Sequence, residues 1–356
     1  MLITRKKLVC IVEYNAFTSD FMIVRSKNNS MLELTNKESR FYSQGCVYNQ
    51  KGKKIAVSER IGGIGGDHVL EVNSNQLPSL SYRRLSLILA KYFFSLLMGK
   101  YYRPLPSCNI ELTTVLYIGN WFGHYGHFIT EGLSRFWNYK TYQYNKIMAM
   151  PFVFDKKKII IKSYQVYMLN IIGISTKHVN VCVQPTVFRK IIIPEQGWIL
   201  NNSVNIGVRP VYNAIRKYHE KNNYQKRYFI SRKQKYFKRI INLKELETVF
   251  EKIGFEILYP ETMPIDQQLF CYANCEVLAS VSGSGLHNSL FARKSTLVIE
   301  IGDLRSRNKP MLMQKMATEL MGQKFEFIPY TGTNEGLLDC AILNKKMTHI
   351  LATKEI

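Results

Sequence analysis

The fold of this chain is decided by VLASVSGSGLHNSLFARKSTLVIEIGD, residues 277–303. The stretch opens with an apolar run of strand length at 277–281, which stops at the small residues Ser-Gly-Ser-Gly, 282–285. A helix is expected over 286–292, followed by a β-rich run at 297–301. A strand, a glycine turn and a helix in this order form a site for an anion, most commonly phosphate. Such turns often only reverse the direction of the chain. The neighbouring segments are therefore needed to distinguish an anion site from a simple turn.

The preceding segments repeat the same alternation. Strands are predicted at 227–230 and 255–259, and helices at 242–253 and 264–274. Asn242 and Glu245 resemble an N-terminal capping box, and Gly254 ends that helix. Successive β-α-β units with short loops predict a parallel, doubly wound sheet whose ligand crevice lies at the carboxyl ends of its strands.

Polar residues follow three of these strands. Ser231 and Arg232 come after the first strand, 282–285 after the third, and Glu300 at the end of the fourth. A guanidinium group binds phosphate oxygens bidentately, and an acidic residue binds ribose hydroxyls in dinucleotide folds. The sequence therefore predicts a site for a nucleoside diphosphate.

A second polar group is expected further upstream. Val115 to Ile118 is predicted to be a strand, 119–125 a turn and 126–137 a helix. On that helix three polar residues fall at i, i+4 and i+8, namely His127, Glu131 and Arg135. Three interpretations stay open here: a solvated ion-pair face, a ligand site at the end of a strand, or a metal site that includes His124, for which no further ligand is apparent.

Length and composition indicate two ordered domains. The chain has 356 residues, 46% of them hydrophobic, and its seven scattered cysteines indicate neither a disulfide framework nor a zinc ribbon. Further strands at 158–162 and 188–194 and a helix at 164–173 complete the expected α/β pattern. The expected division is an N-terminal acceptor-side domain at 1–200, a connection at 201–224, a nucleotide-binding domain at 225–330 and a tail at 331–356 that packs back on the N-terminal domain.

The net charge of +23 requires acidic partners, such as nucleic acid, nucleotide-linked substrates or an anionic membrane. The basic clusters at 51–54, 156–158 and 232–239 are dispersed, and no nucleic-acid-binding motif is present. The apolar run Leu85 to Met98 is too short to span a bilayer and suits a core helix or an interfacial helix.

Several motifs together resemble glycosyltransferase family 61, the DUF563-type enzymes. They include YFISRKQKYFKRIIN at 228–242, SGSGLHN at 282–288, VIE at 298–300 and GHYGHFITEGLSRFW at 123–137. The family usually has His-Gly-Ala-Gly-Leu-Thr-Asn in the second motif and His-Trp in the last. Ser282 and His287 therefore replace the family's His and Thr, and Phe128 replaces its Trp.

The resemblance implies an α/β fold of GT-B type, with two Rossmann-like doubly wound domains facing across a cleft. It implies inverting transfer of a hexosyl or pentosyl group from a nucleotide sugar, with no cofactor and no obligatory metal. The chain also lacks an Asp-x-Asp motif. The expected diphosphate contacts are Arg232, Arg239, Ser282, Gly283, Ser284, Gly285, His287 and Asn288. The expected ribose or base contacts are Ser231 and Glu300, the acceptor-side residues His124 and Arg135, and the general base His127 or Glu131, with Glu131 orienting His127.

The N-terminus lacks the apolar segment of a signal peptide, so we expect a cytoplasmic enzyme at the inner face of a bacterial membrane. Its expected product is a capsule or lipopolysaccharide chain, and its expected partners are a nucleotide sugar, a lipid-linked or oligosaccharide acceptor and anionic lipid, but not nucleic acid. A non-catalytic nucleotide- or polysaccharide-binding module is the alternative, followed by a nucleic-acid-binding protein.

Overall fold

The computed structural model describes residues 2–4, 9–13, 22–25, 46–48, 109–151, 161–181, 186–194, 196–221, 226–233 and 239–353. The apolar run 85–98, the basic clusters 51–54 and 156–158 and most of the strand expected at 158–162 lie outside these residues. The chain forms two compact units. The C-terminal unit comprises 1–4, 163–173 and 203–356, and the N-terminal unit comprises 5–162 and 174–202.

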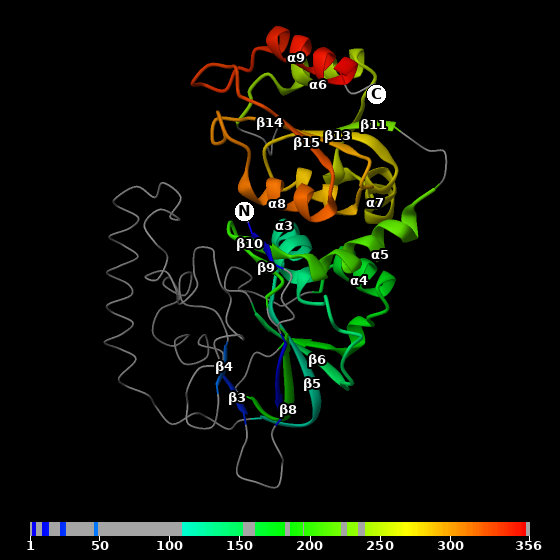
Figure 1. Ribbon diagram of the computed structural model, residues 1–356, viewed down its shortest axis with the longest axis vertical. Helices are drawn as coiled ribbons and strands as arrows, with labels where there is room; N and C mark the ends of the chain where they lie inside the picture. The colour runs from blue at the N-terminus through cyan, green and yellow to red at the C-terminus, as the bar shows by residue number, and fades with distance from the viewer. Residues whose placement is uncertain are drawn as a thin grey trace, which may run out of the picture. The chain divides into compact units, whose positions relative to one another are not determined.

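The C-terminal unit contains a five-stranded sheet in which every strand runs parallel to its neighbours (Figure 1). Its strands are β11 (Lys226–Ile230), β12 (Glu256–Leu258), β13 (Cys275–Val281), β14 (Leu297–Ile301) and β15 (Lys324–Ile328). Their spatial order is β12-β11-β13-β14-β15, so the second strand of the unit lies outside the first. This order defines a doubly wound sheet, as the sequence predicted.

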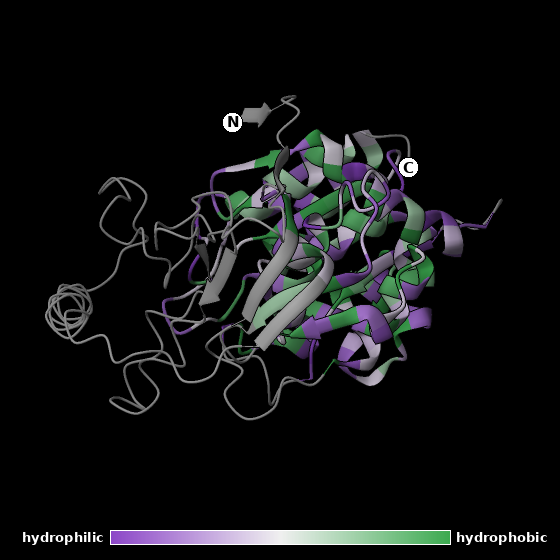
Figure 2. Ribbon diagram, turned by 90° about the horizontal axis from the view of Figure 1, so that it is seen from below, coloured by the Kyte–Doolittle hydropathy of each residue, from purple (hydrophilic) through white to green (hydrophobic). Residues whose placement is uncertain are grey.

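Helices cover both faces of this sheet (Figure 1). The helices of this unit are α4 (Ser163–Ile171), α5 (Arg209–His219), α6 (Leu243–Lys252), α7 (Ile265–Ala273), α8 (Leu312–Met321) and α9 (Cys340–Thr353), and α4 and α5 pack on α7. Helices α6 and α9 share a core with alternate residues of β13 and β14, while α7 and α8 lie against the other face. The helices accordingly carry both hydrophobic and hydrophilic residues (Figure 2), and the central strands are buried on both sides.

The tail at 331–356 and the capping box differ from expectation. Helix α9 packs on α6 and joins the core of the C-terminal unit, not that of the N-terminal unit. The side chain of Asn242 does not cap α6. It instead exchanges hydrogen bonds with the backbone of Leu338, at 2.9 Å in both directions, so it ties the start of α6 to the segment before α9.

The N-terminal unit has a mixed sheet. Parallel strands run in the order β8-β5-β6-β7, with β5 (Asn109–Trp121), β6 (Lys146–Pro151), β7 (Val179–Val181) and β8 (Thr186–Pro194). The antiparallel strands β2 (Val9–Glu13) and β3 (Met22–Arg25) pair with β8, and β4 (Cys46–Tyr48) pairs with β3. The resemblance implied a second Rossmann-like doubly wound domain, and this sheet matches it in the four parallel strands but adds antiparallel ones. Short strands near the N-terminus show in sequence neither their partner nor their direction.

The unit boundaries also differ from those expected at 200 and 225. Strand β1 (Leu2–Thr4) pairs with β10 (Ser203–Asn205), and α4 packs on α5 and α7, so both elements belong to the C-terminal unit. Much of the expected connection at 201–224 is the helix α5. A sequence pattern predicts that a helix exists, but not which sheet it covers. No helix within the described part of the chain is long and apolar enough to cross a membrane.

Candidate functional site

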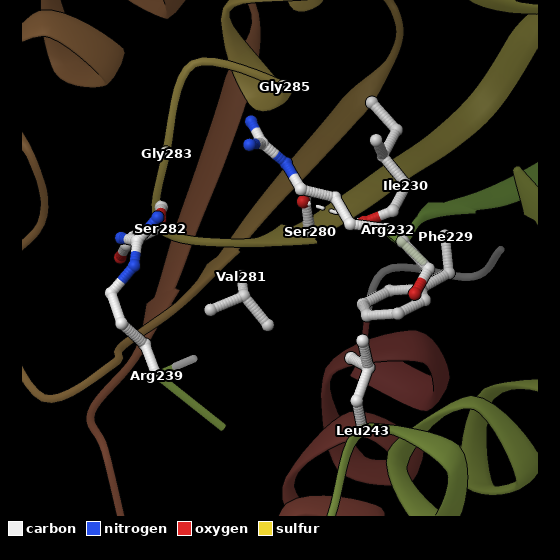
Figure 3. Close-up of a pocket in the computed structure, with 11 residues that line it drawn as sticks. Phe229, Ile230, Arg232, Arg239, Leu243, Ser280, Val281, Ser282, Gly283 and Gly285 are labelled. Carbon is white, nitrogen blue, oxygen red and sulfur yellow. Dashed lines mark hydrogen bonds between the residues drawn. The ribbon is translucent and has the colours of Figure 1, made fainter. Parts of the chain in front are cut away.

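A hollow lies at the carboxyl ends of β11 and β13 in the C-terminal unit. The chain leaves β11 toward β12 on one side and continues through β13 to β14 on the other, so this is the switch point of the sheet. Ligands of open α/β sheets bind at such points. The residues lining the hollow are Phe229, Ile230, Ser231, Arg232, Arg239, Leu243, Ser280, Val281, Ser282, Gly283 and Gly285 (Figure 3).

The turn 282–285 is held close to both neighbouring strands. Ser280 Oγ donates a hydrogen bond of 2.8 Å to the carbonyl oxygen of Ile230, and the backbone N–H of Ser282 donates one of 2.8 Å to that of Ile301. A Cβ added at Gly285 would stand 3.3 Å from Cγ2 of Ile230. Glycine therefore allows the turn to lie against β11, where its backbone borders the hollow.

Two arginines flank this turn. Arg232 extends toward Gly285 and Arg239 toward Ser282 (Figure 3). Arg232 Nη2 donates to Ser284 Oγ at 3.3 Å, and Arg239 Nη1 donates to the carbonyl oxygen of Ser282 at 3.3 Å. Burial lowers the pKa of Arg232, and the charge of Arg239 lowers it further against the opposing effect of Glu261. Because the two cations disfavour each other, an anion bound beside the turn would stabilise both.

Glu300 does not lie where a ribose contact was expected. Alternation along β14 turns its side chain toward α8, and the residue has 0% exposure. Its carboxylate accepts hydrogen bonds from Ser282 Oγ at 2.6 Å and from the backbone N–H of Met311 at 3.1 Å. Burial raises the pKa of Glu300 to about 7, with a further increase from Asp303, while the bonds from Ser282 and Met311 oppose the shift. The carboxylate thus connects the turn to the start of α8.

Three other expected ligand contacts are also engaged within the unit. Ser231 Oγ donates to Glu247 Oε1 at 2.6 Å, and His287 Nδ1 lies 2.9 Å from Oε1 of Gln314 on α8. Asn288 Nδ2 donates to the carbonyl oxygen of Gly285 at 2.8 Å. The expected helix after the turn is a short 3₁₀ helix, η9 (Leu286–Phe291), whose tighter winding places His287 and Asn288 in the interior. Asn288 thus holds the end of the turn, and His287 connects η9 to α8.

Sequence reasoning missed the residues that follow β14. Asp303 is fully buried and accepts a hydrogen bond of 2.5 Å from Arg239 Nη1. Arg305 Nη2 donates to the carbonyl oxygen of Ser282 at 3.1 Å, and Ser306 Oγ donates to Ser282 Oγ at 2.5 Å. The available signal was their position just past the carboxyl end of a strand next to β13.

In the N-terminal unit, a histidine and a glutamate form a close pair after β5. The chain turns into α3 (Tyr125–His127) and then into a π-helix, η4 (Phe128–Gly132), whose five residues are all buried. His127 Nδ1 lies 2.7 Å from Glu131 Oε1, with the side chains 34% and 2% exposed. The rings of Phe122 and His124 lie 5.7 Å and 5.4 Å from that of His127. The expected pairing of His127 with Glu131 is confirmed as a contact.

Arg135 does not join this pair. The π-helix and the turns after it break the 3.6-residue period, so the i+8 position leaves the face of His127. Arg135 is buried and donates to the carbonyl oxygen of Pro194 at 3.1 Å and to Gln196 Oε1 at 3.2 Å. Gly119, with φ of +74°, gives it room, because a Cβ there would stand 3.1 Å from Arg135 Nε. Arg135 therefore ties the segment after η4 to the end of β8 and to the residues that follow it.

Within the described ranges, no three His, Cys, Asp or Glu side chains are grouped so that they could hold a metal ion. His124 thus lies beside the pair as a neighbouring ring.

The doubly wound sheet and the turn at its switch point, with an arginine on either side, define an α/β protein with a positively charged hollow at the carboxyl ends of its strands. The family model described as Glycosyltransferase 61 matches residues 125–299, just under half of the chain. This match includes both the His127–Glu131 pair and the turn 282–285. The match supports membership of glycosyltransferase family 61, and this family points to glycosyltransferase activity and hence to a sugar donor and an acceptor. No curated protein matches the chain.

Proposed function

We propose that this protein transfers a sugar from a nucleoside-diphosphate donor to a hydroxyl group, with inversion and without a metal ion. The observation that carries the proposal is the placement of Arg232 and Arg239 on the turn 282–285 at the switch point. A diphosphate is the donor part that such a site suits, because guanidinium groups pair with phosphate oxygens. We further propose that the two units are the two domains of a GT-B enzyme, with the donor in the C-terminal one.

The charge of the leaving group explains why arginine residues are needed at this site. Transfer breaks the bond between the anomeric carbon and a phosphate oxygen, and negative charge then accumulates on the departing diphosphate. The chain has no Asp-x-Asp motif with which to hold a cation there. Fixed positive groups such as Arg232 and Arg239 stabilise that charge without reorganisation, which is often the largest contribution to catalysis.

The same reaction requires a base for the acceptor hydroxyl, and we assign this role to His127. The carboxylate of Glu131 can only accept a hydrogen bond, so Nδ1 of His127 carries the proton and Nε2 is left as the basic atom. Glu131 is buried, whereas a third of the His127 side chain is exposed. In this proposal His127 takes the hydroxyl proton, and Glu131 orients the imidazole and stabilises the imidazolium that forms.

The acceptor in this proposal is a growing capsule or lipopolysaccharide chain, lipid-linked at the cytoplasmic face of a bacterial inner membrane. The net charge of +23 supports the location, because each basic residue near an anionic leaflet contributes about 1 kcal/mol of attraction.

A donor screen tests the proposal. The purified protein is heated with UDP-, GDP-, CMP- and dTDP-sugars, with and without EDTA, and the stabilising donor is then used in a transfer assay with oligosaccharide acceptors. A ligand at a hundredfold excess over its Kd stabilises the native state by about 2.7 kcal/mol. We expect one nucleotide class to stabilise the protein in EDTA and to support transfer. Binding without transfer would favour a non-catalytic binding module, and dependence on a divalent ion would contradict the metal-independent mechanism.

A further inference from the structure

A buried carboxylate organises two arginines at the edge of the turn. Asp303 follows β14 and has 0% exposure. Its Oδ2 atom accepts hydrogen bonds from Arg239 Nη1 at 2.5 Å and from both Nε and Nη2 of Arg305 at 3.3 Å. One acceptor atom thus holds two guanidinium groups that come from segments far apart in the sequence.

The other carboxylate oxygen fixes Asp303 itself. Oδ1 accepts hydrogen bonds from the backbone N–H of Arg305 at 2.9 Å and from that of Ser306 at 3.1 Å, and Ser306 Oγ lies 3.2 Å from it. Because backbone groups hold Oδ1, the position of Oδ2 does not depend on the flexible arginine side chains. The carboxylate is therefore in place before any ligand arrives.

Both guanidinium groups also contact the turn. Arg239 Nη1 and Arg305 Nη2 donate to the carbonyl oxygen of Ser282 at 3.3 Å and 3.1 Å. A Cβ added at Gly283 would stand 3.9 Å from Arg239 Nη2, so this nitrogen borders the turn backbone. The two arginines consequently lie on the same turn as Arg232, whose Nη2 contacts Ser284.

The charges of this group do not cancel. One carboxylate faces two guanidinium groups, which leaves a net positive charge at the turn even before Arg232 is counted. The side chain of Arg305 is 53% exposed and that of Arg239 is 26% exposed, whereas Asp303 is buried. An ion pair with a half-exposed arginine contributes little to stability. The exposed part of the Arg305 side chain is thus accessible to an anionic ligand.

We propose that Asp303 is a positioning residue that holds Arg239 and Arg305 as a guanidinium pair, and that Arg305 is a further contact for the donor's diphosphate. This inference rests on the proposed function, which it extends to residues beyond the matched family region. Arg232 binds the diphosphate on one side of the turn, and the pair binds it on the other.

Inorganic pyrophosphate lacks the sugar and the nucleobase of the donor, so its binding tests the contacts of Asp303 and Arg305 with the diphosphate alone. Titration calorimetry would measure the affinities of wild type, R305A, R305K and D303N for pyrophosphate, and also for UDP and UMP. Hydrogen bonds between charged groups are worth about 1.5 to 3 kcal/mol, so we expect R305A to bind pyrophosphate about 10- to 100-fold more weakly. We expect R305K to regain part of this affinity. We also expect R305A to lose more affinity for UDP than for UMP, because only UDP has the second phosphate.

Arg307 provides a matched control in the same loop. It is exposed, and its Nη1 donates to Asn334 Oδ1 at 2.9 Å. R307A removes the same charge and should leave pyrophosphate affinity within about twofold, because screening weakens charges that do not contact the ligand.

A double variant separates positioning from direct contact. If Asp303 acts through Arg305, D303N weakens pyrophosphate binding in wild type but causes a smaller further loss in R305A. Additive losses would overturn the positioning role. If D303N fails to fold by circular dichroism, the two Arg305 variants carry the test by themselves. Affinity of R305A equal to that of R307A would overturn the inference.

The proposed function can fail separately. Pyrophosphate binding with the expected pattern but no sugar transfer would keep the inference and remove the enzyme assignment. Wild-type sugar transfer without measurable pyrophosphate or UDP binding would overturn the inference and leave the transferase in place.

Discussion

Nδ1 of His127 lies 2.7 Å from Oε1 of Glu131, and the histidine is the more exposed partner of the pair. The π-helix buries Glu131 along with its neighbours, while His127 stands at the end of α3. A buried carboxylate that accepts a hydrogen bond from Nδ1–H fixes one tautomer of the ring. In the proposed mechanism His127 is therefore the base and Glu131 the residue that orients it, a choice that the sequence left open.

H127N should lower kcat by about 10²- to 10⁴-fold, the usual contribution of a general base. Donor affinity should stay unchanged, because the base acts on the acceptor. E131Q should lower kcat by a smaller factor, since the amide oxygen can still accept a hydrogen bond from Nδ1–H but stabilises the imidazolium less. Steady-state kinetics with the donor identified by the screen checks both.

His178 offers a control for these variants. It is an exposed histidine of the same unit, in the 3₁₀ helix η5 (Thr176–His178). H178N should retain wild-type kcat. If H127N, folded by circular dichroism, also kept wild-type kcat, His127 would not be the base.

Glu300 should make the protein less stable as the pH rises. Its pKa of about 7 exceeds the ordinary value of 4.5, so the folded state keeps a proton that the unfolded chain releases. Stability from this group is complete below pH 4.5 and is lost as the pH rises to about 7, a change of about 3 kcal/mol. Urea unfolding between about pH 5 and about pH 7.5 measures the decline.

E300Q cannot titrate, and its amide oxygen can still accept hydrogen bonds from Ser282 and Met311. Its free energy of unfolding should therefore decline less over this pH range than that of wild type. Glu251, exposed on α6, supplies the control, and E251Q should follow the wild-type curve. Parallel curves for E300Q and wild type would show that the buried carboxylate does not titrate in this range.

The region from 226 to 301 was largely predictable from sequence. Its strands are apolar runs that end at polar or glycine residues, and the helix α6 stops at Gly254, which has φ of +86°. Each of these signals is local, and a parallel sheet requires strands that are buried on both faces. The position of the turn 282–285 at the switch point follows from the same pattern.

The directions of the side chains were not predictable in the same way. Whether Glu300 faces the crevice or α8 depends on the pleat of β14, and the position of Arg135 depends on a π-helix that no residue in the sequence marks. The bond between Arg239 and Asp303 joins residues 64 positions apart. Such contacts arise from the strand order, which the sequence pattern left open.

Two glycines with left-handed backbone allow the cost of backbone strain to be measured separately from the cost of side-chain crowding. Gly119 and Gly254 have φ of +74° and +86°, but a Cβ at Gly119 would meet Arg135, whereas one at Gly254 would meet nothing within 4 Å. G254A should therefore cost only the backbone strain, about 1 kcal/mol. G119A should cost about 2 kcal/mol or more, because the buried Arg135 must also move from its two carbonyl partners. Denaturant unfolding compares the two, and equal losses would show that Arg135 yields without cost.

Membrane association should depend on salt. With a net charge of +23, the protein should co-sediment with vesicles that contain phosphatidylserine or phosphatidylglycerol, but not with vesicles of phosphatidylcholine alone. Raising the salt from about 0.1 M to about 1 M shortens the Debye length from about 10 Å to about 3 Å, so most of the bound protein should be released. Binding that persists at high salt would instead indicate insertion of apolar residues, for which the run 85–98 is the candidate, and its deletion would then abolish the residual binding. No binding to anionic vesicles at low salt would contradict the membrane location. A soluble acidic partner would then be the explanation for the excess positive charge.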